Sequence, residues 1–94
     1  MDDNQLQRAI QSVGKSCFVK YYKQFKDFSR SNEELVELLM KNEKYTETAS
    51  ATRVSKSRSI INAGRAKDVL LEITQSEKLD DDVKTKARKL LGEF

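Results

Sequence analysis

Apolar residues recur every three or four positions along the first third of the chain, from Leu6 to Phe28. This spacing places them on one stripe of an α-helix, with lysines on the opposite side. The pattern predicts one long amphipathic helix from about residue 4 to residue 28, which Gly14 weakens by ~1 kcal/mol relative to alanine. The stripe consists of Leu6, Ile10, Val13, Cys17, Tyr21, Phe25 and Phe28, widened by Ala9, Phe18 and Tyr22.

Four shorter helices are predicted after it, at about residues 33–42, 47–62, 66–76 and 83–91. Ser31 followed by Glu34 is the pattern of a capping box at the start of the first of these helices. The apolar run from Leu35 to Met40 follows it, so we expect this helix to be the most buried element. Thr46 or Thr48 can cap the next helix. Asp80-Asp81-Asp82 suits the start of the last one, because negative charge is favoured at a helix N-terminus.

Composition supports a purely helical fold. The 94 residues include no proline and three glycines, fewer turn residues than a sandwich or barrel needs. We therefore expect a single all-α domain over residues 1–94, a small four- or five-helix bundle. Beside the N-terminal helix, its predicted core consists of Leu35, Leu38, Leu39, Val54, Ile61, Val69, Leu70, Ile73, Val83, Leu90 and Leu91.

The same composition narrows the function classes. Only 37% of residues are hydrophobic and 35% are charged, which leaves little apolar surface for enclosing a dry substrate pocket. No apolar run approaches the ~18 residues of a membrane span. The N-terminus is acidic and polar, unlike a signal peptide, and one cysteine forms no internal disulfide. We expect a cytoplasmic protein with no membrane partner, and a core role for the aromatic stripe.

Three short patterns suggest chemistry and are better explained by structure. Residues 9–16 fit a relaxed P-loop, but no strand precedes them and the predicted helix runs through them. The chain has no histidine that could activate Cys17, so we expect this cysteine to be a small buried apolar side chain. Asp80-Asp81-Asp82 lacks the glycine and glutamate of a calcium loop. The sequence predicts no enzyme, no cofactor and no metal.

Charge is distributed in blocks along a chain whose net charge is +3. Residues 15–30 contain five cationic and one anionic side chain, and so do residues 46–67. Residues 68–82 contain one cationic and six anionic side chains. This asymmetry predicts that any polyanionic partner approaches from one side, with the acidic block facing away.

The third predicted helix has the least ordinary face. It combines short polar side chains, which permit close approach, with cationic ones that reach base edges or phosphates. Residues 31–63 resemble a generic helix-turn-helix module, although Asn42 to Tyr45 is longer than the usual turn and lacks its glycine. The resemblance implies binding of double-stranded DNA in a regulatory or targeting role. The candidate DNA contacts are Thr48, Thr52, Arg53, Ser55, Lys56 and Ser59, flanked by Arg58, Arg65 and Lys67.

Two alternatives to DNA binding stay open. The basic face is also compatible with an ordinary solvated helix. A protein–protein interaction module fits as well, with Tyr45, Ile60 or a face of the last two helices as the contact, and with the chain acting alone or as a homodimer. Salt separates the two functions, because DNA binding weakens steeply as salt rises and apolar protein contacts do not.

Overall fold

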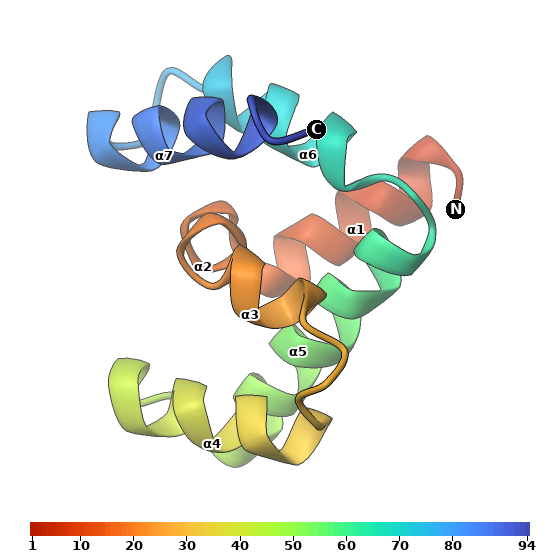
Figure 1. Ribbon diagram of the computed structural model, residues 1–94, viewed down its shortest axis with the longest axis vertical. Helices are drawn as coiled ribbons and strands as arrows, with labels where there is room; N and C mark the ends of the chain where they lie inside the picture. The colour runs from red at the N-terminus through yellow and green to blue at the C-terminus, as the bar shows by residue number, and fades with distance from the viewer.

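Seven α-helices and no strand make up the chain in the computed structural model, which describes residues 1–94 (Figure 1). The helices are α1 (Asp3–Val13), α2 (Lys15–Lys20), α3 (Tyr22–Lys26), α4 (Asn32–Glu43), α5 (Glu47–Asn62), α6 (Ala66–Thr74) and α7 (Asp81–Leu91). The all-α prediction is confirmed. The expected number of four or five helices is too small, because the N-terminal segment is divided.

The prediction of one continuous helix over residues 4–28 is wrong. Gly14 has a φ of 85° and ends α1, and a second break at Tyr21 separates α2 from α3. Glycine adopts this positive φ without the steric cost that a Cβ brings. The breaks let parts of the apolar stripe pack on different neighbours: α1 and α3 lie against α5, and α2 lies against α7. Phe28, the last residue of the predicted stripe, is exposed.

Side-chain caps begin both α4 and α5. The Ser31 hydroxyl accepts a hydrogen bond from the Glu34 N–H at 3.2 Å, and the Thr46 hydroxyl accepts one from the Ala49 N–H at 3.1 Å. Each cap satisfies a main-chain donor that the first helical turn leaves unpaired. Both start sites therefore follow from local sequence, with Thr46 rather than Thr48 as the cap of α5.

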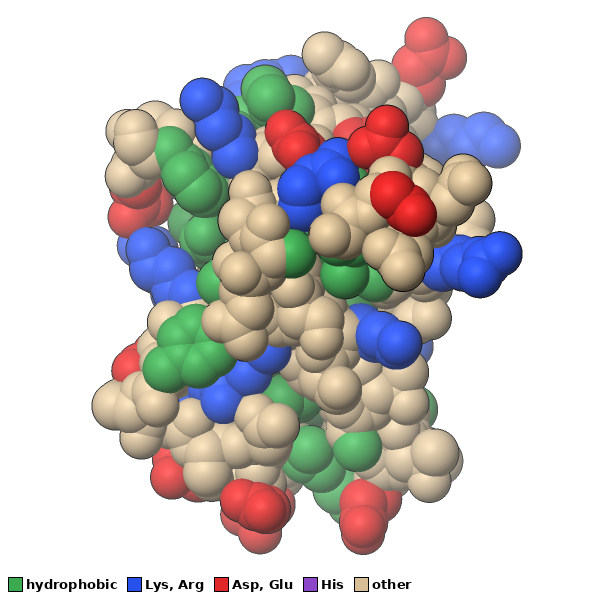
Figure 2. Space-filling view, turned by 90° about the vertical axis from the view of Figure 1, so that its right-hand side faces the viewer, with side chains coloured by type: hydrophobic (Ala, Val, Ile, Leu, Met, Phe, Trp, Pro, Cys, Tyr) green, Lys and Arg blue, Asp and Glu red, His purple; other side chains and the backbone are tan.

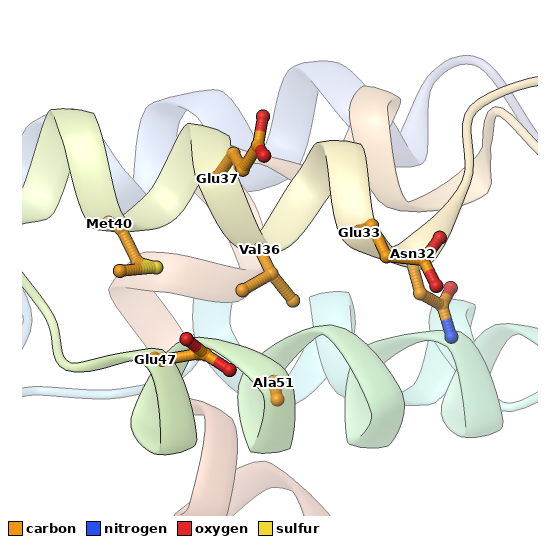
Figure 3. A pocket seen from close by; sticks show the side chains of 7 residues that line it. All are labelled: Asn32, Glu33, Val36, Glu37, Met40, Glu47 and Ala51. Atoms are coloured by element: carbon orange, nitrogen blue, oxygen red, sulfur yellow. The ribbon is translucent and has the colours of Figure 1, made fainter.

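The connection between α4 and α5 is shorter than the sequence suggested. It consists of Lys44–Thr46, three residues, and not of a longer segment from Asn42 to Tyr45. Lys44 adopts the left-handed conformation, with φ 62°, that glycine usually supplies at the end of a helix. The two helices run side by side with opposite chain directions, as an antiparallel hairpin (Figure 3).

The second helix pair, α6 and α7, lies at the top of Figure 1, and α4 lies at the bottom. The acidic block of residues 68–82 belongs to this upper pair. Asp80, Asp81 and Asp82 start α7 at the upper left of the view, apart from α5, which crosses its centre and right. Asp68, in contrast, lies in the first turn of α6 and bonds to Arg65, just beyond the end of α5.

One hydrophobic core joins all seven helices. Its 20 members are Leu6, Ala9, Ile10, Val13, Cys17, Phe18, Val19, Tyr21, Tyr22, Phe25, Leu35, Leu39, Val54, Ile60, Ala66, Val69, Leu70, Ile73, Ala87 and Leu90. Leu38, Ile61, Val83 and Leu91, also predicted as core, are half-buried and pack against it. Ile60 is fully buried, so the expectation that it forms a surface contact is wrong. The central helix α5 contributes just two of these apolar side chains, Val54 and Ile60, and buries Ser50, Ser57 and Arg58 beside them.

Candidate interaction surfaces on helices α4 and α5

The nine residues predicted to contact DNA fall into two groups. Six side chains are exposed to solvent: Thr48, Thr52, Ser55, Lys56, Ser59 and Lys67. The three arginines are withdrawn from the surface, because Arg58 is buried and Arg53 and Arg65 are half-buried. Arginine is the residue best suited to reading guanine edges and holding phosphates, so the contacts of these three decide what the surface can bind.

Arg58 is held inside the protein by the chain that connects α3 to α4. Its Nε donates to the carbonyl of Phe25 at 3.0 Å, and its Nη2 donates to the carbonyl of Asp27 at 2.9 Å. Its Nη1 donates to Oδ1 of Asn32 at 2.7 Å, and the guanidinium lies 4.9 Å from the Phe28 ring centroid. The side chain is 8% exposed. Arg58 therefore fixes the α3–α4 connection instead of flanking a DNA-binding face.

Arg53 is also committed to contacts within the fold. Its Nη1 donates to the carbonyl of Val13, at the end of α1, and its Cζ lies 4.1 Å from the centroid of the Tyr45 ring. Cation–π stacking and a main-chain acceptor both stabilise this position. The guanidinium thus joins the break at Gly14 to the α4–α5 connection, and it does not extend into solvent as a base-reading side chain must.

Arg65 is neutralised by carboxylates. Its Nη2 donates to Asp3 at 2.7 Å, its Nε donates to Asp68 at 2.6 Å, and its Nη1 donates to the main-chain carbonyl of Met1 at 2.8 Å. The hydrogen bond to Asp3, followed by the one to Asp68, raises the pKa of Arg65 above its ordinary value. This cluster ties the N-terminus of the chain to the start of α6.

A polar groove between α1 and α5 contains Lys56 and Ser59, two of the exposed residues that were predicted to contact DNA. Its volume is about 360 Å³, and it is lined by Met1, Gln5, Arg8, Ala9, Ser12, Lys56 and Ser59. Arg8 and Lys56 are exposed, and neither forms an ion pair. On the face that carries the N-terminus, Figure 2 shows mostly uncharged polar surface between separate basic side chains. Arg8 was not predicted from the sequence, because only the packing of α1 on α5 places it in the same groove as Lys56.

A larger groove, of about 520 Å³, lies between α4 and α5. Val36 and Met40 project from α4 toward α5, where Ala51 faces them (Figure 3). Met40 is 36% exposed and Ala51 is exposed, whereas the other apolar residues of α4 and α5 are buried or half-buried. At the bottom of Figure 2, hydrophobic side chains reach the surface beside acidic ones. The full lining is Asn32, Glu33, Val36, Glu37, Met40, Glu47 and Ala51.

The charged lining of this α4–α5 groove is entirely acidic. Glu33, Glu37 and Glu47 are exposed, and none of them lies within ion-pair distance of a lysine or arginine. This groove was not predicted from the sequence, because the helix that contains the run from Leu35 to Met40 was expected to be the most buried element. In the structure only Leu35 and Leu39 of that helix are buried.

The end of α4 is fixed to α2 by a polar cluster. Oε2 of Glu43 accepts hydrogen bonds from Nζ of Lys20 and the hydroxyl of Tyr21, both at 2.6 Å. The bond from Lys20, followed by the one from Tyr21, lowers the pKa of Glu43. Cys17 lies in the adjacent core, and burial raises its pKa, which favours the unreactive thiol form. The prediction that Cys17 is a buried side chain is confirmed.

Comparisons with protein-family models, with curated proteins and with solved structures found no match to this chain. Within the structure itself, no helix combines the length and apolar character that crossing a bilayer requires. No three or more histidine, cysteine, aspartate or glutamate side chains are grouped so that they could hold a metal ion. The residues before Gly14-Lys15-Ser16 form helix α1 and not the strand of a P-loop.

Proposed function

We propose that the chain is a non-catalytic protein-interaction module whose binding surface is the α4–α5 groove. The observation that favours this function is the apolar row between two helices, in which Met40 and Ala51 are exposed and Val36 is half-buried. Apolar side chains that share a concave surface are typical of sites for protein partners, whereas scattered single ones are not. Methionine suits such a surface, because its flexible thioether adapts to different partners.

Site-specific photocrosslinking tests this function in cells that express the chain. A benzophenone amino acid replaces Met40 in the groove, and in a matched control it replaces Leu71, which is also exposed but lies on α6. We expect a discrete protein adduct from position 40 alone, and its loss when Val36→Asp is added. Equal adducts from both positions, or adducts that survive Val36→Asp, contradict a binding role for the groove.

Binding of double-stranded DNA is a second candidate, favoured by the polar groove between α1 and α5. Arg8 and Lys56 form no ion pair there, and Ser59 adds a hydroxyl group that can donate to a phosphate oxygen, whereas the Ser12 hydroxyl donates to the Arg8 carbonyl at 3.1 Å. In this proposal α4 and α5 act in the manner of a helix-turn-helix unit in regulation or targeting. Thr52 and Ser55 then face the DNA, and Lys67 holds its backbone.

Titration of labelled duplex DNA at about 50 mM and about 200 mM salt tests the second candidate. DNA binding predicts a steep loss of affinity with salt, and a further loss in Arg8→Ala/Lys56→Ala. Arg30→Ala/Lys78→Ala is the matched control, since it removes the same charge from other parts of the surface. No binding at the lower salt concentration, or equal weakening by both double variants, excludes the α1–α5 groove as a DNA site.

A further inference from the structure

We infer that the occupant of the α4–α5 groove is a cationic amphipathic helix of another protein. This inference rests on the function proposed above and names the chemistry of the partner. It follows from three features of the groove: the shape of its apolar floor, the negative charge of its rim, and the lack of ion pairs between the rim glutamates and the lysines and arginines of the chain.

The apolar floor matches the side of a helix. Val36 and Met40 are four residues apart on α4, and Ala51 is four residues after Glu47 on α5, so the floor follows the spacing of two helical surfaces. A groove between two antiparallel helices accepts the apolar stripe of a third one, with residues at i, i+4 and i+7 as anchors. Ala51 has the small side chain that close approach of such a helix requires.

The rim surrounds this floor with carboxylates. In Figure 3, Glu47 extends over the groove from α5, Glu33 stands near one end, and Glu37 rises from the opposite side of α4. A bound helix therefore meets negative charge on both flanks of its apolar stripe. Lysine and arginine at those flanking positions complement the rim, whereas acidic residues are repelled.

Helix stability explains only part of this charge. Glu33 and Glu47 lie in the first turns of α4 and α5, where the helix dipole favours a carboxylate. Glu37 lies in the middle of α4 and gains nothing from the dipole. It is four residues after Glu33, a spacing at which like charges repel each other, and four residues before Lys41, with which it forms no ion pair. The chain has more cationic than anionic side chains, yet none of them pairs with these three glutamates. A cationic partner relieves this repulsion.

Fluorescence anisotropy with designed peptides tests the inference. The probe is a labelled peptide of about 16 residues, long enough to form a helix, with leucines on one stripe and lysines on both flanks. A second peptide has glutamate at every lysine position. We expect the lysine peptide to bind at least tenfold more tightly than the glutamate peptide, and to lose at least fivefold in affinity for Glu33→Gln/Glu37→Gln/Glu47→Gln. The matched control, Glu34→Gln/Glu77→Gln/Glu93→Gln, neutralises the same number of carboxylates elsewhere and should lose less than twofold.

The outcomes separate this inference from the proposed function. Circular dichroism and the urea midpoint first establish that each variant is folded. If the glutamate peptide binds as well as the lysine peptide, and Val36→Asp/Met40→Asp abolishes both, the groove binds helices and the cationic preference is wrong. If neither peptide depends on Val36 and Met40, the groove does not bind helices and this inference fails, whereas the proposed function fails only if crosslinking at position 40 is also negative. A dimer detected by sedimentation that disappears in Val36→Asp identifies a second copy as the occupant and also overturns the inference.

Discussion

The Nε–H of Arg58 donates to the main-chain carbonyl of Phe25 across 3.0 Å, joining the middle of α5 to the last turn of α3. Two further bonds, to the carbonyl of Asp27 and to Oδ1 of Asn32, engage the two terminal nitrogens of the guanidinium. The acceptors therefore lie at the end of α3, in the loop after it, and at the first residue of α4. One side chain orients α4 on α5, and with it the groove between them.

Replacing Arg58 should destabilise the protein strongly. Arg58→Ala removes the donor to the carbonyl of the buried residue Phe25 and two further bonds, although the Asp27 carbonyl keeps a bond from the Arg30 N–H. Hydrogen bonds to charged groups contribute about 1.5–3 kcal/mol each. We expect a loss of about 3 kcal/mol in urea unfolding, and only partial recovery in Arg58→Lys, because an ammonium group cannot reproduce the planar fork. Arg8→Ala, at an exposed site, should change stability by less than about 0.5 kcal/mol. Similar urea midpoints for Arg58→Ala and Arg8→Ala would contradict the structural role.

Alanine substitutions at Gly14 and Gly64 test the break between α1 and α2. Gly14 forms this break, and Gly64, which follows α5, is the control. Both have positive φ, 85° and 73°, so alanine is strained at either position by about 1–3 kcal/mol, and the ψ of 130° at Gly14 lies outside the left-handed helical region. A Cβ at Gly64 meets nothing within 4 Å, whereas one at Gly14 lies 3.3 Å from Nη1 of Arg53. Urea unfolding should therefore show a larger loss for Gly14→Ala than for Gly64→Ala. Equal losses would show that the contact with Arg53 contributes nothing.

These residues also show what local sequence can and cannot predict. Ser31 and Thr46 marked helix starts correctly, since a cap acts within three residues of itself. Gly14 was recognised as weak but not as a break, because the break depends on α2 packing against α7 far along the chain. Arg58 looked like a surface cation, because nothing near it in sequence reveals the carbonyl of Phe25.

In the candidate site, too, the features set by local sequence were predicted and those set by tertiary packing were not. The polar side chains of α5 were predicted correctly as exposed at Thr52, Ser55 and Lys56. The α4–α5 groove was not predicted, because its floor needs two helices side by side. Val36 and Met40 belong to the same apolar run as the buried Leu35 and Leu39, and only tertiary packing distinguishes them. The glutamates of the rim were visible in the sequence, but only tertiary packing brings Glu47 of α5 to the same groove as Glu33 and Glu37 of α4.

Removing a buried hydroxyl from α5 should stabilise the protein. The Oγ of Ser57 is buried and has no hydrogen-bond partner. Ser57→Ala removes the cost of burying that group, and alanine is also the better helix former. We expect a gain of about 1 kcal/mol in urea unfolding. Ser59→Ala, at an exposed position of the same helix, isolates the helix-propensity effect and should gain less than half as much. A loss of stability in Ser57→Ala would show that the hydroxyl has a partner.

Glu43 should make stability depend on pH. Its hydrogen bonds with Lys20 and Tyr21 lower its pKa in the folded protein below the ordinary value of 4.5. The ionised carboxylate therefore stabilises the fold above the unfolded-state pKa, and this contribution is lost as the pH falls through the lowered folded-state pKa. Urea unfolding should show the wild type to be more stable than Glu43→Gln at neutral pH, with the difference disappearing in strong acid.

The partners of Glu43 supply the control for this prediction. In a Lys20→Met/Tyr21→Phe background the donors are absent, so introducing Glu43→Gln should change the pH dependence far less. Such a double-mutant comparison isolates the interaction from other effects of removing the carboxylate. If Glu43→Gln alters the pH profile equally with and without Lys20 and Tyr21, the lowered pKa has another cause. In that case the end of α4 is not fixed by this cluster.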